Sequence, residues 1–124
     1  MRRARCCRSV EQLAEHPCFG AVVENAVVSE IVKRHLNEGD NPELFFYRDD
    51  SKREIDLLDF TGSSSPVAVE VKSSRTHRDK YARHLGICDE LGIARENRYV
   101  VARVESSFAT SSCNVSLLRD WLMR

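Results

Sequence analysis

The stretch from Arg53 to Ser73 constrains the fold of this chain more than any other, because two alternating runs flank a turn sequence there. Apolar and polar residues alternate on both sides of a Gly-Ser-Ser-Ser-Pro cluster at residues 62–66. Two such runs divided by Gly, Ser and Pro are typical of a β-hairpin. We therefore predict that the two runs pair as antiparallel strands around a turn centred on Ser63.

The predicted hairpin separates a charged face from an apolar face. Centring the turn on Ser63 places Asp56 opposite Glu70, and the same register places Glu54 opposite Lys72. Because successive side chains of a strand point to opposite faces, these four share one face. The other face is expected to be the core face and to carry Ile55, Leu57, Val67, Val69 and Val71.

The charged face is a candidate metal site. Directly opposed Cβ atoms lie roughly 4.5–5.5 Å apart, and Mg²⁺ is often held by one or two carboxylates together with substrate phosphate. Lys72 points to the same spot as Asp56 and Glu70. The alternative is a solvated outer strand in which Glu54 and Lys72 form a weak cross-strand ion pair. The hairpin alone favours the ion pair, so the choice depends on which other residues converge there.

Length and composition indicate one globular domain. The chain has 124 residues, of which 42% are apolar and 31% charged, as in a folded soluble protein. No apolar run approaches the ~18 residues of a membrane span, so no membrane partner is expected. The five cysteines are odd in number and form no Cys-x-x-Cys pair, which argues against a disulfide framework or a zinc site. A reducing cytoplasm is the expected location.

Charge is unevenly distributed although the formal net charge is zero. Residues 37–59 hold eight acids and three bases, whereas residues 72–83 hold five bases and one acid. Among those bases, Arg75, Arg78 and Lys80 are the candidate nucleic-acid-binding residues, because they follow the charged face of the hairpin directly. The alternative is a solvated helix face, which such charge runs often are.

A first helix is predicted from after Gly20 to about Leu36. At helical spacing, one arc carries Val23, Val27, Val28, Ile31 and Val32. Glu24 falls in the middle of this arc, where a carboxylate is costly unless it is paired, hydrogen-bonded or bound to metal. It belongs either to a buried ion pair, for which Arg48 is the candidate partner, or to a site shared with the acids of the hairpin. A pair with Arg34 accounts for Glu30.

The remaining segments complete a mixed sheet. Leu44–Arg48 is predicted as a strand that precedes the hairpin, and residues 77–91 as a helix that Gly92 ends. That helix is a crossover long enough for Arg98–Val104 to form a fourth strand in parallel pairing. Residues 105–116 are predicted as loop, followed by a short closing helix that contains Val115, Leu118 and Leu122.

The predicted fold class is thus α/β (α+β), with a helix, three antiparallel strands, a crossover helix and a parallel-paired fourth strand. This order, with an acid on the first helix, an acid on the second strand and Glu-x-Lys on the third, resembles the PD-(D/E)XK nuclease superfamily and its restriction-endonuclease-like fold. More closely, His16–Ile31, Phe46–Asp56 and Val69–Ser74 are similar to the uncharacterised C-terminal domain of many prokaryotic AAA-type ATPases. The resemblance covers about Val10 to Val104.

The resemblance implies a role for each motif residue. It implies Asp56 and Glu70 as ligands of Mg²⁺ or Mn²⁺, a main-chain carbonyl ligand from Val71, water positioning or activation by Lys72, and an accessory acid in Glu24. The superfamily's proline before the motif aspartate is replaced here by Ile55. That departure is common in divergent members of the superfamily.

The resemblance also implies an ATPase partner. Related proteins carry a nucleotide-binding module upstream, whereas this sequence has no Gly-x-x-x-x-Gly-Lys-Ser/Thr loop. We expect one nuclease-like domain over residues 1–124, with residues 1–16 as the remnant of an upstream segment and the ATPase module on the same or a partner chain.

Two functions fit these features. The first is a Mg²⁺-dependent nuclease that hydrolyses phosphodiesters of DNA or RNA. The second is a non-catalytic module that binds nucleic acid or a partner ATPase, because fold does not imply function. A purely structural role explains neither Glu24 nor the pairing of Asp56 with Glu70.

Overall fold

The fold is seen in a computed structural model, which describes residues 18–62 and 65–123. The expectations for residues 1–16 and for Ser63 as the turn centre lie outside this described part. Within it, no helix has the length and apolar content needed to cross a membrane.

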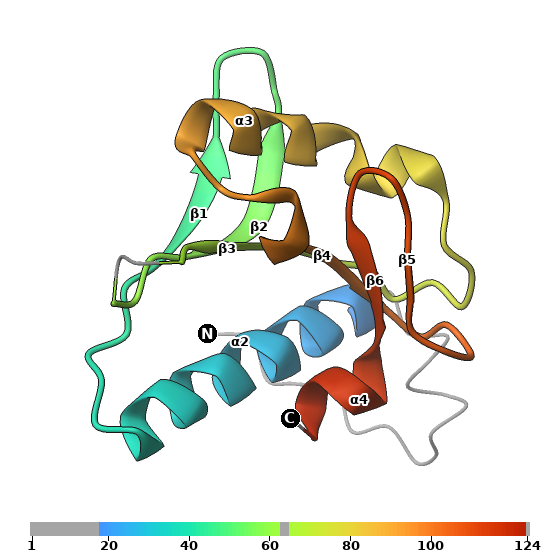
Figure 1. The fold of residues 1–124 in the computed structure, drawn as a ribbon. Coiled ribbons are helices and arrows are strands. Elements are labelled where there is room, and N and C mark those ends of the chain that lie inside the picture. The colour runs from blue at the N-terminus through green and yellow to red at the C-terminus, as the bar shows by residue number, and fades with distance from the viewer. Residues whose placement is uncertain (1–17, 63–64, 124) are drawn as a thin grey trace.

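Six strands form one mixed sheet in the order β1-β2-β3-β4-β6-β5 (Figure 1). Their bounds are β1 (Leu44–Arg48), β2 (Glu54–Asp59), β3 (Val67–Val71), β4 (Arg98–Ala102), β5 (Phe108–Ala109) and β6 (Asn114–Leu117). The first three strands pair antiparallel, β4 is parallel to both β3 and β6, and β5 is antiparallel to β6. The predicted mixed fold, including a fourth strand parallel to the third, is confirmed.

Helices cover both faces of the sheet. On one face lie α2 (Phe19–Asn37) and α4 (Leu118–Leu122), and on the other lie the 3₁₀-helix η1 (Asp79–Ile87) and the short α3 (Cys88–Leu91) (Figure 1). A short 3₁₀ turn, η2 (Arg95–Asn97), leads into β4. Each face therefore has its own buried apolar cluster. Full burial of one such aliphatic side chain contributes about 1.5–3 kcal/mol.

The α2 helix packs through a narrow stripe, and a glycine follows its last turn. Val23, Val27 and Ile31 are its buried residues, spaced four apart on one side. The predicted position of Glu24 in the middle of a buried arc is therefore corrected, because it lies beside this stripe and is only half-buried. Gly39 adopts φ 82°, the left-handed conformation that commonly stops a helix.

The hairpin has the predicted register from Leu57 to Asp59, with Leu57 opposite Val69 and Leu58 opposite Ala68, but the strand pairing does not extend to the expected pairs of Asp56 with Glu70 and Glu54 with Lys72. Leu57, Val69 and Val71 share the cluster beneath α2, with Val67 partly buried at its margin. Ile55 contradicts the prediction, because it packs in the cluster on the opposite face.

A bulge in β2 explains the position of Ile55. Against β1, the partner of Phe45 is Leu58 and the partner of Tyr47 is Ile55, so β2 carries one extra residue between these pairs. Such an extra residue disrupts the regular alternation of side chains at that point. The bulge lies at Asp56 and Leu57.

The charged face of the hairpin is covered at Glu70, whereas Glu54 is exposed. Glu70 retains only 5% of its exposed area. The reason is that η1 packs over β2, β3 and β4, on the face of the sheet where Ala68 is also buried. The alternative of a freely solvated outer strand is therefore wrong at Glu70.

Two further segments differ from expectation. The predicted loop at residues 105–116 contains β5 and the start of β6, because Val115 is buried beside Val100 in a parallel pair. The closing helix begins only at Leu118. The predicted crossover helix over residues 77–91 is only partly helical in the α sense. Arg78 is extended, and the residues after it form mainly the 3₁₀-helix η1. Gly92 ends α3 with φ 71°, as expected.

Candidate functional site

Asp56 and Glu70 are anchored to each other's strands. The main-chain N–H of Asp56 donates to Glu70 Oε1 at 2.9 Å, and the main-chain N–H of Val71 donates to Asp56 Oδ2 at 2.8 Å. The bulge in β2 brings the Asp56 side chain to this position between the strands. Each carboxylate thus uses one oxygen for a main-chain amide and has its second oxygen for another partner.

Lys72 joins the pair at the end of β3. Its Nζ lies 3.6 Å from Glu70 Oε2 and 5.5 Å from the centre of the Tyr81 ring. The main-chain N–H of Lys72 donates to the carbonyl of Val101 at 2.8 Å, which continues the β3–β4 pairing by one residue. The lysine is therefore held beside Glu70 by both its backbone and its side chain.

Arg103 fixes the chain just after Lys72. Its Nε donates to the carbonyl of Ser73 at 2.7 Å, and its main-chain N–H donates to the carbonyl of Ser74 at 2.9 Å. The guanidinium lies 4.5 Å over the ring of Phe19, at the start of α2. This contact links the Glu-x-Lys strand to the helix that carries Glu24.

Glu24 reaches Asp56 from α2. The two residues line one pocket of about 270 Å³, together with Phe46, Tyr47, Arg48, Glu54 and Ile55. Glu70 and Lys72 are not among the lining residues of this pocket. Asp56 is therefore the residue common to both parts of the site, since it contacts Glu70 within the sheet and faces Glu24 across the pocket.

All three carboxylates of the site have a raised pKa. Burial raises the pKa of Glu70 to about 7, and the Asp56 charge adds to this effect. Burial also raises the pKa of Asp56, against the opposing hydrogen bond from Val71. For Glu24, burial and then the Asp56 charge raise the pKa. A bound cation would reduce the repulsion between neighbouring carboxylates of this kind.

The ion pairs proposed as alternatives do not form. Arg48 Nε lies 2.9 Å from Glu54 Oε1, so this arginine pairs with Glu54 and not with Glu24. Lys72 pairs with Glu70 and not with Glu54. On the far side of α2, Glu30 pairs with Lys33 at 4.0 Å, which corrects the expected Glu30–Arg34 pair. The reason is that the Arg34 guanidinium instead donates to the carbonyl of Trp121.

The basic residues after β3 are exposed. Arg75, Arg78 and Lys80 all lie at the surface between β3 and the start of η1. Lys80 Nζ is 5.9 Å from the centre of the Tyr81 ring, the same ring that Lys72 approaches. Tyr81 therefore connects the basic segment to the carboxylate site.

Phe46 is a site residue that the sequence reasoning missed. It lines the pocket of Glu24 and Asp56 and is 76% exposed on the edge strand β1. The signal was present in the sequence, because Phe45, Phe46 and Tyr47 are consecutive and adjacent residues of a strand face opposite sides. At least one large aromatic ring had to face away from the core.

The three carboxylates of the site are of the type that a hard divalent cation binds, but among the described residues they do not form a group whose ligand atoms all lie within 4.8 Å of one another. Asp56, Glu70 and Glu24 offer carboxylate oxygens only, and Mg²⁺ or Mn²⁺ prefers oxygen ligands. The carbonyl of Val71, expected as a further ligand, belongs to the residue whose amide anchors Asp56. Its role as a ligand stays a prediction.

Comparison with known proteins identifies a family whose function is unknown. Residues 19–119 match the family model described as "Domain of unknown function (DUF4143)". No curated protein and no solved structure matches the chain.

Proposed function

Because the chain belongs to the DUF4143 family, a domain of unknown function, we propose its activity from the geometry of its site. We propose a nuclease-like domain that hydrolyses phosphodiester bonds of DNA or RNA with the help of Mg²⁺ or Mn²⁺. The proposed catalytic residues are Asp56, Glu70, Lys72 and Glu24.

The reciprocal anchoring of Asp56 and Glu70 carries this proposal. The two main-chain hydrogen bonds, at 2.9 and 2.8 Å, hold the buried carboxylate of Glu70 beside the half-buried carboxylate of Asp56 although their charges repel. A buried carboxylate beside a second carboxylate is costly unless a partner compensates its charge. Lys72, at 3.6 Å from Glu70, supplies only part of that compensation. A divalent cation would supply the rest.

Each residue has a separate task in the proposed reaction. Asp56 and Glu70 would hold the cation, with Glu24 contributing from the pocket side. Bound Mg²⁺ or Mn²⁺ stabilises negative charge on a phosphate and makes water a better nucleophile. Lys72 would orient the attacking water through its ammonium donors, and Tyr81 and Glu70 limit the positions that this side chain adopts. Holding the reacting groups in place supplies much of the rate enhancement.

The basic segment would bind the substrate. Arg75, Arg78 and Lys80 are exposed beside Tyr81, which also contacts Lys72. Phosphate contacts from such side chains position a nucleic acid without reading its sequence. DNA or RNA is therefore the proposed partner of this edge of the domain.

A non-catalytic role is the second candidate, and one observation favours it. Glu70 is 5% exposed and does not line the pocket that Glu24 and Asp56 share. If Glu70 remained inaccessible to substrate, the domain would bind nucleic acid or a partner ATPase and would cleave no phosphodiester bond. The resemblance of the motif segments supports an AAA-type ATPase, of the same or a partner chain, as that partner.

A cleavage assay tests the proposal. The intact chain is incubated with single- and double-stranded DNA and RNA, with and without Mg²⁺ or Mn²⁺. Asp56→Asn is the test variant, and Asp50→Asn, at an exposed position in the β1–β2 turn, is the matched control. The proposal expects metal-dependent cleavage that Asp56→Asn abolishes and Asp50→Asn retains. Binding without turnover on any substrate, even with the ATPase partner added, supports the non-catalytic role.

A further inference from the structure

A second group of metal-ligating side chains lies at the C-terminal end of α2, apart from the Asp56 site. His35, Glu38 and Asp40 each offer one ligand atom, and these atoms all lie within 4.8 Å of one another. We propose that this His35 cluster is a binding site for a divalent transition-metal ion of the Zn²⁺ class. The inference does not depend on nuclease activity.

The backbone at the end of α2 brings the three residues together. The N–H of Asp40 donates to the carbonyl of His35 at 2.8 Å, and the N–H of Gly39 donates to that of Leu36 at 3.1 Å. These two bonds with a left-handed Gly39 are the Schellman motif. The motif turns the chain back on itself, so Asp40 returns to the last turn of the helix beside His35.

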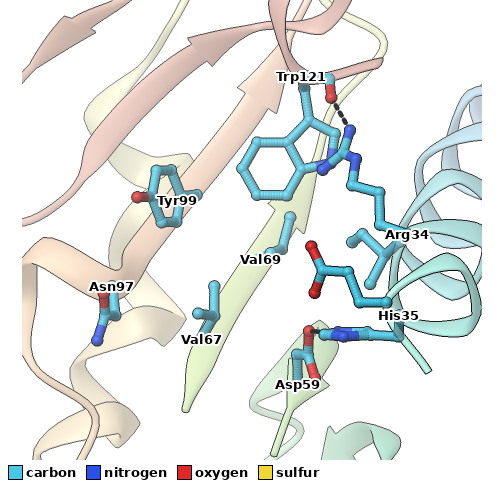
Figure 2. A pocket seen from close by; sticks show the side chains of 10 residues that line it. Arg34, His35, Asp59, Val67, Val69, Asn97, Tyr99 and Trp121 are labelled. Atoms are coloured by element: carbon cyan, nitrogen blue, oxygen red, sulfur yellow. Dashed lines mark hydrogen bonds and ion pairs between the residues drawn. The ribbon is translucent and has the colours of Figure 1, made fainter. Parts of the chain in front are cut away.

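The orientation of His35 is the second, independent observation. Its Nε2 lies 2.6 Å from Asp59 Oδ2 in β2, and Figure 2 shows this contact at the edge of the pocket. The other ring nitrogen, Nδ1, is buried and has no hydrogen-bond partner among the residues that the structure describes. Asp40 Oδ2 lies 3.8 Å from Nδ1, which is beyond hydrogen-bonding distance.

This arrangement is the one that metal-binding histidines use. A ligating imidazole almost always donates its other N–H to a carboxylate, which fixes the tautomer and the ring orientation. With Nε2–H directed to Asp59, the lone pair of His35 is on Nδ1 and faces Asp40. Asp59 is held in turn, because its Oδ1 accepts the main-chain N–H of Thr61 at 3.0 Å. The orienting carboxylate is therefore itself fixed.

The local field favours a cation. The carbonyl end of α2 carries the negative end of the helix dipole, and Glu38, Asp40 and Asp59 add three carboxylates. Arg34 lines the same pocket and opposes this field, although its guanidinium donates to the carbonyl of Trp121. One imidazole nitrogen with two carboxylate oxygens is a ligand set suited to Zn²⁺ and similar ions, and less to Mg²⁺. Three protein ligands would leave a fourth position open. His35 and Glu38 also line the pocket of about 300 Å³ shown in Figure 2.

The distances between the ligand atoms of the His35 cluster can shorten to those found around a bound ion. With Zn–ligand distances of ~2.0–2.1 Å, tetrahedral ligand atoms stand about 3.3 Å apart. Glu38 and Asp40 are exposed at the surface, so rotation of their side chains can supply the movement while His35 stays fixed by Asp59. The competing explanation is a protonated His35 that bridges Asp59 and Asp40 as an ion pair and binds no metal.

Zinc titration of the full chain, followed in long-range ¹H–¹⁵N spectra of the histidine rings, tests the proposal. The His35 signals are assigned by their absence in His35→Gln. We expect Zn²⁺ to change the ¹⁵N chemical shift of His35 Nδ1. The ring signals of His84, whose Nδ1 lies by the backbone of Glu54, should stay unchanged. We also expect Asp40→Asn to weaken Zn²⁺ binding at least tenfold, and Asp59→Asn to weaken it about 10–100-fold through loss of ring orientation.

Two controls keep the test specific. Glu43→Gln alters an exposed acid three residues beyond the cluster and should leave the affinity unchanged. Asp56→Asn should also leave the His35 shift unchanged, which separates this site from the proposed nuclease site. Asp40→Asn alters an exposed side chain and should leave the fold intact, so its Zn²⁺ affinity can be measured even if the His35→Gln protein unfolds. The proposal is overturned if Zn²⁺ leaves Nδ1 unshifted, or if Asp40→Asn binds Zn²⁺ as tightly as the unaltered chain.

Discussion

Asp56 and Glu70 hold each other through main-chain amides, since Asp56 N–H donates to Glu70 Oε1 and the neighbour of Glu70, Val71, donates to Asp56 Oδ2. Neither contact is a bond between the two side chains. The carboxylates are thus brought together by the backbone, and their mutual repulsion remains. This repulsion makes the pair sensitive to protons, to cations and to neutral replacement.

Glu70→Gln should stabilise the protein in the absence of divalent cations, and more so as pH rises. The pKa of Glu70 is raised from 4.5 to about 7, chiefly by burial and then by Asp56. The folded state therefore holds more protons than the unfolded state between pH 4.5 and 7, and stability falls as pH rises through that window. Glutamine keeps an acceptor for Asp56 N–H and carries no charge. We expect a gain of about 1–3 kcal/mol at pH 8 that shrinks towards zero near pH 5.

Urea unfolding at a series of pH values, with EDTA present, measures this effect. Glu43→Gln removes a carboxylate at an exposed position and serves as the control, with little expected change at any pH. A loss of stability in Glu70→Gln at pH 8 would show that the ionised carboxylate is stabilised by Lys72 and the amide, and is not strained.

Glu24→Gln should lower metal affinity with little effect on folding. The residue is half-buried at the pocket shared with Asp56, and burial together with the Asp56 charge raises its pKa. Removing its charge relieves repulsion when no cation is bound, so the midpoint temperature of thermal unfolding should rise slightly or stay constant. Mg²⁺ or Mn²⁺ affinity, measured by calorimetry, should fall because one oxygen donor is weakened. A sharp drop in stability with unchanged affinity would make Glu24 a structural residue.

The register of the hairpin was predictable because local chemistry determines it. A one-residue slip would move every side chain to the other face, and the Gly/Ser/Pro turn fixes the length of the loop. The observed pairs of Leu57 with Val69 and Asp59 with Val67 follow from these two constraints. The parallel fourth strand was predictable for a similar reason, because the intervening segment is long enough for a crossover.

Features that depend on a third element were not predictable from alternation. The bulge that moves Ile55 to the other face arises from the pairing of β2 with β1. The burial of Glu70 depends on η1, which packs over β3 only in the folded chain. β6 was missed because it is four residues long and follows a Ser/Thr-rich stretch. The contact of His35 with Asp59 joins residues 24 apart in sequence and leaves no periodic pattern.

Replacing the exposed basic residues together should weaken nucleic-acid binding equally for all sequences. Arg75, Arg78 and Lys80 lie at the surface beside Tyr81, and side chains of this type contact phosphates. Removing one lysine or arginine from a phosphate lowers the slope of log affinity against log salt by about 1. Changing all three to alanine should therefore reduce the slope by about 2–3. Fluorescence anisotropy with labelled single-stranded DNA at several salt concentrations measures it.

Lys33 offers the matched control for that experiment. It is an exposed lysine on α2, on the opposite side of the sheet from η1, and its partner is Glu30 at 4.0 Å. Lys33→Ala removes a positive charge but should leave the salt slope unchanged. An equal effect of Lys33→Ala and the triple replacement would mean that binding follows total charge and that no particular edge of the domain is used.

Lys72→Ala should separate chemistry from binding. Its Nζ lies 3.6 Å from Glu70 Oε2 and beside Tyr81, where it would orient the attacking water, whereas the proposed phosphate contacts come from the exposed residues after it. Loss of a group that orients or deprotonates water typically costs about 10²-fold or more. We therefore expect Mg²⁺-dependent cleavage to fall by about that factor while nucleic-acid affinity changes little.

The alanine also leaves the buried Glu70 charge without its ammonium partner, so lower stability alone could reduce the rate. Lys72→Met, which keeps most of the side-chain length without the charge, and thermal unfolding of both variants control for this effect. Comparable unfolding temperatures with cleavage reduced about 10²-fold in both would assign the loss to the ammonium group. Cleavage that survives in Lys72→Met at the unaltered rate would remove Lys72 from the proposed mechanism and leave Asp56, Glu70 and Glu24 as its acids.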